Sequence, residues 1–159
     1  MDLVEVKSKD IPSRKTDTSI VTRIDRLSSY LVAKRVDTKA VNPPKKRGTL
    51  VVFKELLAEM ERVLPTPVKE ISSDSGGEFK AELGRFMKAK GIDHRAVPLG
   101  AAIESRNGVI QRHMYKLIHL NRKGGLDKHI RDAVHLCNTT TSKVIKVRPS
   151  DAVNKKASE

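Results

Sequence analysis

The order of apolar and polar residues predicts that the chain begins with three β-strands. Residues 2–6 alternate between apolar and acidic positions, which is the pattern of a half-buried strand. Two further runs, 18–25 and 28–36, are rich in β-branched residues and are separated by a short turn. A basic linker that contains Pro43 and Pro44 follows the third run and is expected to lack regular structure.

Beyond this linker, helical and strand-like patterns alternate. Apolar residues every three or four positions predict an amphipathic helix over 49–64, which Pro65 and Pro67 end. Gly91 is expected to cap the C-terminus of the helix predicted over 78–91. The remaining predicted elements are a strand at 68–72, a helix over 78–91, a strand at 92–97, a loop over 98–106, a helix that begins at Asn107 and a last helix with a core stripe from Leu126 to Cys137.

This order of elements is typical of an α/β domain in which helices flank a mixed sheet. At 159 residues, the chain is long enough for one domain with a buried core. It contains no run of roughly 18 apolar residues, so we expect no membrane span. The only cysteine, Cys137, excludes an internal disulfide and a cysteine-rich zinc site. A nuclear or other intracellular compartment is therefore expected.

Charge is the strongest feature of the composition. The chain has 32 Lys and Arg residues against 19 Asp and Glu residues, for a formal net charge of +13. Such a surplus favours polyanionic partners, with nucleic acid ahead of an acidic membrane. Aromatic residues make up only 3%, so base stacking on aromatic side chains is not favoured and phosphate contacts are expected. The alternative is a basic structural protein of a ribonucleoprotein.

Two aspartates stand where a mixed sheet could bring them together. Asp2 lies on the first predicted strand, and Asp74 ends the fourth, within the sequence SDSGGEF. Two close carboxylates repel each other and persist best when a cation lies between them. Mg²⁺ takes carboxylate oxygens together with substrate phosphate, and two such ions can serve phosphoryl transfer. From spacing alone, a capping or turn role for Asp74 is an equal alternative.

Five motifs follow one another along nearly the whole chain. In order they read DLVEV, IDRLSSYLVAKRV, SDSGGEF, NGVIQRHMYKL and CNTTTSKVIKVRPSDAV. Together they resemble the catalytic core of retroviral and gypsy-like LTR-retrotransposon integrases. The resemblance implies a ribonuclease-H-like fold, with a mixed five-stranded sheet flanked by helices, and DNA end processing and strand transfer that depend on Mg²⁺ or Mn²⁺.

The resemblance also bears on domain organisation and partners. It implies that residues 1–159 are a single core-like domain, a fragment without the flanking zinc-binding and C-terminal domains of a complete integrase. DNA is the implied partner, and a homodimer or higher oligomer is the implied assembly.

In the resembled family, three acidic residues form the catalytic site. Asp2 and Asp74 match the first two positions and are the expected metal ligands, but the third falls on Gln111. An amide offers one neutral carbonyl oxygen where a carboxylate offers two charged oxygens. We therefore expect weak metal binding and little or no catalysis. Both an engineered and a natural loss of the glutamate fit the sequence.

Glu104 is the alternative acid for the third position, whereas Asp25 is expected to have another role. Glu104 lies in the predicted loop before Gln111 and could serve only if that loop folded back. Asp25 is better interpreted as a turn residue that caps a hairpin. Because of Gln111 and the high charge, a domesticated, non-catalytic nucleic-acid-binding or assembly module with an integrase fold stays open as an alternative.

The residues expected to contact DNA lie on or just beyond the helix that carries Gln111. Positive side chains there could neutralise phosphates beside a metal site. A solvated helix face is the alternative of equal weight. The residues are Asn107, Arg112, Lys116, Arg122 and Lys123.

Overall fold

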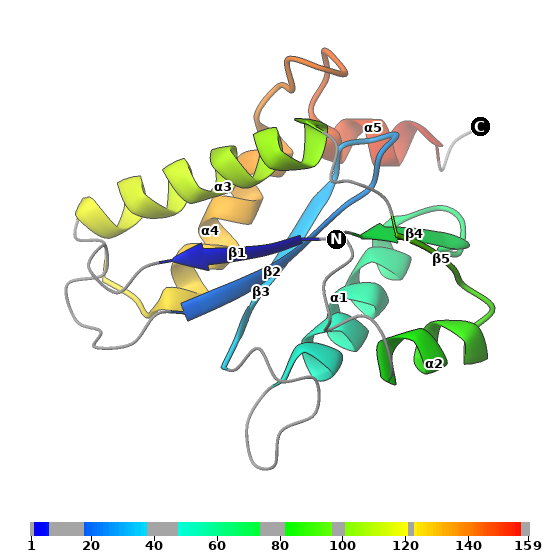
Figure 1. Cartoon of the computed structure of the whole chain (residues 1–159). Helices are drawn as coiled ribbons and strands as arrows, with labels where there is room; N and C mark the ends of the chain where they lie inside the picture. The colour runs from blue at the N-terminus through cyan, green and yellow to red at the C-terminus, as the bar shows by residue number, and fades with distance from the viewer. Residues whose placement is uncertain are drawn as a thin grey trace.

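The computed structural model places helices on both faces of a small β-sheet (Figure 1). The structure describes residues 2–6, 18–37, 48–73, 82–96, 101–120 and 123–156. The elements in chain order are β1 (Asp2–Val6), β2 (Thr18–Ile24), β3 (Leu31–Val36), α1 (Thr49–Val63), β4 (Glu70–Ser73), α2 (Glu82–Ala89), β5 (Asp93–Ala96), α3 (Ala101–His119), α4 (Leu126–Thr139) and α5 (Pro149–Lys156).

The strands of the described residues form two sheets. β1, β2 and β3 pair in that order and are antiparallel, with Asp2 opposite Thr22. β4 and β5 pair in parallel, with Ser73 opposite Ala96. The single mixed five-stranded sheet expected from the sequence is therefore not formed by the described part of the chain.

The separation lies at the end of β2 that extends past β1. Because β1 begins at Asp2, its register with β2 ends at Thr22, one residue short of Arg23. At this level a cavity of about 160 Å³ is lined by Arg23 and Ile24 of β2 and by Ile71 and Ser72 of β4. Paired strands lie only about 4.7–4.9 Å apart. β2 and β4 are therefore not paired at this level.

Both faces of the three-stranded sheet are buried. Val21 and Val32 lie on one face and pack with Phe53 of α1. Ile20 and Leu31 lie on the other face and pack against α3 and α4. Because both faces are covered, β2 and β3 are apolar at successive positions rather than at alternate ones. The buried residues of α3 and α4 in this second cluster are Ile110, Met114, Leu117, Ile118, Leu126, Ile130, Ala133 and Cys137.

Asn138 fixes the C-terminal end of α4 to the edge strand β3. Its Nδ2 donates a hydrogen bond to the carbonyl oxygen of Leu31 at 2.8 Å, and its Oδ1 accepts one from the amide of Leu31 at 2.9 Å. Asn138 is buried. Its amide thus satisfies backbone groups that a neighbouring strand would otherwise pair.

The ends of two helices differ from the prediction. α3 begins at Ala101 rather than at Asn107, so the expected loop is helical from residue 101. The alanines at its start favour a helix, and Gly108 is tolerated inside it. α5 was not predicted, because its eight residues carry too few apolar positions to show a period; Pro149 at its first position was the available signal.

Other boundaries are confirmed or lie outside the described residues. Gly91 adopts a φ of 67°, and the amide of Ile92 donates to the carbonyl of Met87, as expected for a helix C-cap. The predicted start of the preceding helix at residue 78 lies outside the described residues, and α2 is described from Glu82.

The Asn138 contact predicts a large effect on stability. Replacing Asn138 with Ala leaves two buried backbone groups without partners, so the free energy of unfolding should fall by about 2–4 kcal/mol. Urea denaturation followed by circular dichroism measures this change. His135→Ala, at an exposed position of the same helix, is the control and should change it by less than about 0.5 kcal/mol. Equal effects of the two substitutions would show that Asn138 does not hold α4 on the sheet.

Candidate functional site

A buried hydrogen bond between β2 and α3 organises the candidate site. The Thr22 hydroxyl donates to Oδ1 of Asn107 at 2.9 Å. Thr22 is 1% exposed and Asn107 is 6% exposed. Thr22 is also the residue of β2 that pairs with Asp2. The hydrogen bond therefore places α3 over the part of the sheet where β1 begins.

Gln111 follows Asn107 by one helical turn on α3. Residues four apart lie on the same side of a helix, so Gln111 shares the side that carries the contact to Thr22. Gln111 is half-buried. The fold thus brings the backbone of Asp2 and the third predicted position to the same end of the sheet.

The second predicted position, Asp74, lies outside the described residues. It directly follows Ser73, the last residue of β4. In the view of Figure 1, the arrow of β4 points toward the start of β1.

Ser73 and His94 form a contact that the sequence did not reveal. Ser73 Oγ lies 2.8 Å from His94 Nε2, which joins β4 to β5 directly before Asp74. Ser73 is fully buried, so its hydroxyl serves the structure rather than nucleophilic chemistry. The two residues are 21 positions apart on parallel strands, and no motif links them.

Asp25 has the turn role expected for it. Its Oδ2 accepts hydrogen bonds from the amide of Ser28 at 2.8 Å and from the hydroxyl of Ser28 at 2.5 Å. The amide of Asp25 donates to the carbonyl of Tyr30 at 2.9 Å. The carboxylate therefore shapes the β2–β3 turn.

The residues predicted to contact DNA fall into three groups. Arg112, Lys116 and Lys123 are exposed. Asn107 is buried and bonded to Thr22, so its described contact is internal. Arg122 lies outside the described residues.

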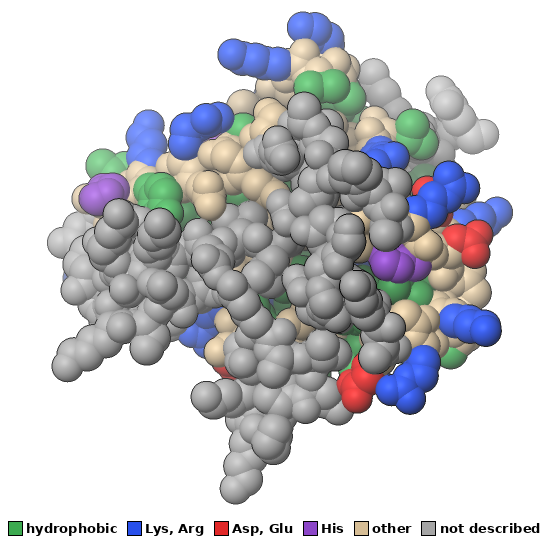
Figure 2. Space-filling view, in the orientation of Figure 1, with side chains coloured by type: hydrophobic (Ala, Val, Ile, Leu, Met, Phe, Trp, Pro, Cys, Tyr) green, Lys and Arg blue, Asp and Glu red, His purple; other side chains and the backbone are tan. Residues whose placement is uncertain are grey.

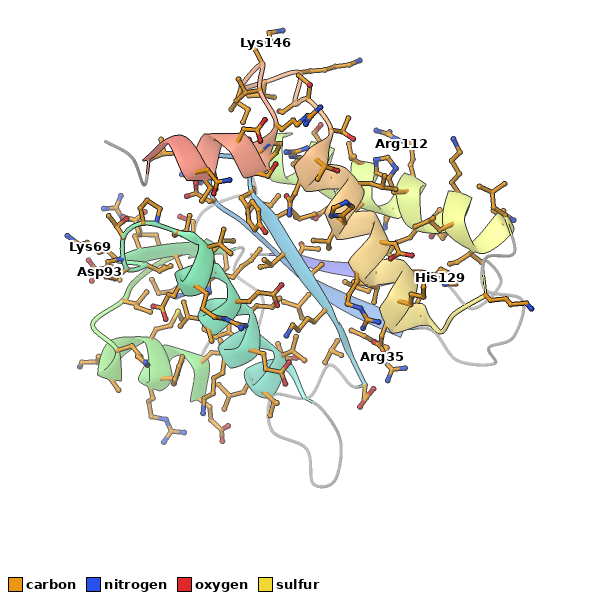
Figure 3. All side chains as sticks on the ribbon, turned by 180° about the vertical axis from the view of Figure 1, so that it is seen from behind. Arg35, Lys69, Asp93, Arg112, His129 and Lys146 are labelled. Carbon is orange, nitrogen blue, oxygen red and sulfur yellow. The ribbon has the colours of Figure 1, made fainter. Side chains whose placement is uncertain are left out.

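Exposed positive charge runs along α3. Between residues 105 and 120 no acidic residue offsets Arg112 and Lys116. Figure 2 shows Lys and Arg side chains over α3 and over the segment after α4, and Figure 3 shows Arg112 and Lys146 at this end of the molecule. Burial, and then the charges of Arg112 and Lys116, lower the pKa of His113. Among the described side chains of α3 from residue 105 to residue 119, the charged ones are therefore all basic.

The donor atoms at the predicted positions suit a hard cation. Two carboxylates and one amide supply oxygen ligands. Mg²⁺ and Mn²⁺ prefer oxygen ligands, whereas Zn²⁺ also takes nitrogen and sulfur ligands. Within the described residues, no three His, Cys, Asp or Glu side chains are grouped as they would be around a metal. The residues therefore fit a divalent cation by type, with one charge fewer than three carboxylates would give.

Known structures match this chain, whereas known sequence families do not. No protein-family model matches the chain, and no curated protein sequence matches it. Solved structures do match. The HTLV-2 integrase catalytic core domain, in complex with magnesium and in a trimeric form, superimposes with a TM-score of 0.74 at 17% identity, covering 96% of this chain and 92% of that one. This chain has the fold of an integrase catalytic core.

Two further structures support the same integrase-core fold. The catalytic core domain of BIV integrase gives a TM-score of 0.68 at 15% identity and covers 87% of each chain. A simian T-cell lymphotropic virus intasome, in complex with PP2A regulatory subunit B56 gamma, gives 0.71 at 17% identity, covering 92% of this chain and 50% of that one. The ribonuclease-H-like α/β fold is thereby confirmed. None of the described helices is long and apolar enough to span a bilayer.

The Thr22–Asn107 hydrogen bond can be tested by a double-mutant cycle. Thr22→Val and Asn107→Ala should each lower the free energy of unfolding by about 1–3 kcal/mol, because each leaves a buried polar group without this partner. The double variant should lose less than the sum, with a coupling energy of about 1 kcal/mol or more. Thr22→Val with Asn154→Ala, a residue of α5, is the control pair and should be additive. Additive losses for Thr22 and Asn107 would contradict the proposed link between β2 and α3.

Proposed function

We propose that this chain is the catalytic core of an integrase-type polynucleotidyl transferase that acts on DNA phosphodiesters with Mg²⁺ or Mn²⁺. We also propose that Gln111 leaves it with little or no activity. The observation that carries the proposal is the Thr22–Asn107 hydrogen bond, in an integrase-core fold, with Asp2 opposite Thr22 and Gln111 one turn after Asn107.

Each residue has a role in this proposal. Asp2 and Asp74 would hold the divalent cation, and Gln111 would contribute at most a neutral oxygen at the third position. When bound, such a cation activates the attacking oxygen and stabilises the leaving oxygen of the phosphodiester. Arg112 and Lys116, exposed on the same helix, would hold the DNA by its phosphates.

The proposal extends to partners and assembly. The net charge of +13 and the basic side of α3 favour DNA as the partner. The HTLV-2 integrase core has been solved in dimeric and trimeric forms, and we propose that this chain also forms a homodimer or higher oligomer. Residues 1–159 would form one core domain of that assembly.

A second candidate function is non-catalytic. The amide at position 111 and the positive charge along α3 together favour a module that binds nucleic acid or supports assembly without reacting. This candidate shares the fold and the DNA contacts of the first, and differs only in whether the metal site acts.

Gln111→Glu is the test that separates the two. With Mg²⁺ or Mn²⁺ and a branched DNA substrate, we expect Gln111→Glu to raise the rate of strand cleavage and joining at least about 100-fold over the chain as given, because a metal ligand is restored. The products are followed on a denaturing gel.

Two controls make this test specific. His119→Glu adds the same charge at an exposed position of α3 that does not line the basic cavity beside α3, and it should leave the rate unchanged. Gln111→Glu combined with Asp74→Asn should lose the gained activity. If the Gln111→Glu protein binds the branched DNA as tightly as the unchanged chain and still does not react, the non-catalytic candidate replaces the first.

A further inference from the structure

A second cavity, of about 630 Å³, lies beside α3 and apart from the candidate catalytic site. Its walls come from the β2–β3 turn, from the first half of α3 and from the segment that follows α4. The basic residues that line it include Arg26, Arg106, Arg112 and Lys143. Its size is within the usual range for small-molecule sites, about 300–1,000 Å³.

The charges around this cavity are of one sign. Among the described residues that line it, none is acidic. The other large cavity, of about 720 Å³ between β3 and α4, differs in this respect because Lys34 and Arg35 there face Glu59 and Asp127. Of these two cavities, only the one beside α3 has described lining residues that are basic without acidic partners among them.

Part of the lining of the basic cavity is apolar. Ile24, Val109, Cys137 and the exposed Val144 form this part, and serine and threonine side chains line the cavity as well. Burial raises the pKa of the Cys137 thiol to about 11, so this side chain is a neutral part of the wall at physiological pH. A lining that is partly apolar and partly basic suits a ligand that has a flat, weakly polar part and an anionic part.

The cavity and Gln111 use opposite flanks of α3. Arg106, Val109 and His113 recur at helical spacing and all line the cavity, whereas Gln111 lies on the side of Asn107. Arg112 is exposed between the two flanks and also lines the cavity. A strand bound here would therefore lie across the helix from the candidate catalytic residues.

The walls of the cavity are held by internal contacts. Arg106 donates from its guanidinium to the carbonyl oxygen of Ser29 at 2.9 Å. Ser29 adopts a φ of 56°, a left-handed conformation that costs a non-glycine residue energy and persists only where neighbours hold it. The segment after α4 is closed by the amide of Ser142, which donates to Val147, and by the amide of Lys146, which donates to Ser142. The site is therefore preorganised.

We propose that this cavity binds one unpaired nucleotide of a DNA single strand, with its base against the apolar lining residues and its flanking phosphates on the basic ones. The proposal rests on the proposed function, which makes DNA the partner. A guanidinium plane can stack on a base where aromatic side chains are lacking. A base of intact duplex is stacked inside the helix and does not enter such a cavity without being flipped out. The site would therefore select a single-stranded end or branch.

Charge reversal of two basic lining residues tests the proposal. Arg26 and Lys143 are exposed, and neither side chain has a hydrogen bond or an ion pair with another described residue. Arg26→Glu with Lys143→Glu should weaken binding of a fluorescein-labelled oligothymidylate at least about tenfold beyond a control of equal charge change, as measured by anisotropy with the whole chain. The slope of log affinity against log salt should shrink by about 1.4, since each single-strand phosphate contact contributes about 0.7.

The control reverses two exposed lysines at the end of α2, Lys88→Glu with Lys90→Glu, which line neither this cavity nor the small cavity that Arg26 shares with β4. Blunt duplex should bind the cavity variant and the control alike. An abasic strand of equal length should bind the unchanged chain more weakly than oligothymidylate does.

Three results would overturn the proposal, and they differ in what they say of the proposed function. If cavity and control variants weaken the single strand equally, the cavity holds no strand, and the proposed function stands. If the abasic strand binds as tightly as oligothymidylate, or if RNA of the same sequence binds much more tightly than DNA, no DNA base is seated there. If the unchanged chain binds neither single strand nor duplex, the proposed function fails as well.

Discussion

The hydrogen bond between Thr22 and Asn107 determines where α3 crosses the sheet. The apolar stripe of α3 buries Ile110 and Met114, but apolar packing is non-directional and would allow the helix to slide or roll. A buried hydroxyl that donates to a buried amide is directional and favours one position of the helix, because a shift breaks this bond at a cost of about 1–3 kcal/mol. The positions of Gln111 and of the basic cavity both follow from this contact.

Three sides of α3 have three different roles. Its inner side packs on β2 and β3 through the second core cluster. One flank carries Gln111 on the side of Thr22 and Asp2, and the other carries Arg106 and the basic cavity. Since α4 is held to β3 by Asn138 and packs in the same cluster as α3, the scaffold beneath both flanks is rigid. A helix that is fixed in this way can position a metal site and a nucleic-acid site at once.

The sequence predicted the elements that long periodic patterns mark. The strand at 2–6, the first amphipathic helix and the Gly91 cap are found as expected, and the integrase-like motifs led to the right fold. The start of α3 and the whole of α5 were missed because short alanine-rich or polar helices show no apolar period. The division of the described strands into two sheets is a tertiary arrangement that no local pattern encodes.

The site was predictable in part for a related reason. Motifs indicated Asp2, Asp74 and Gln111, but only the fold shows that the register of β1 with β2 and the contact of Thr22 with Asn107 bring positions 2 and 111 to one end of the sheet. The contact of Ser73 with His94 and the cavity flanked by Arg26 and Lys143 join segments distant in sequence, so no spacing rule could reveal them. The residues of both proposed sites are therefore brought together by tertiary contacts.

We propose that Asp2, Asp74 and position 111 form one cation site at the start of β1. The most direct measurement is paramagnetic broadening by Mn²⁺ of the backbone amide signals in NMR spectra of the Gln111→Glu protein. Selective broadening is expected at Thr22, Asn107 and position 111, together with its loss when Asp74→Asn is added. Broadening that persists in that variant, or that is found instead around Glu59 and Asp127 in the cavity between β3 and α4, would contradict a shared site.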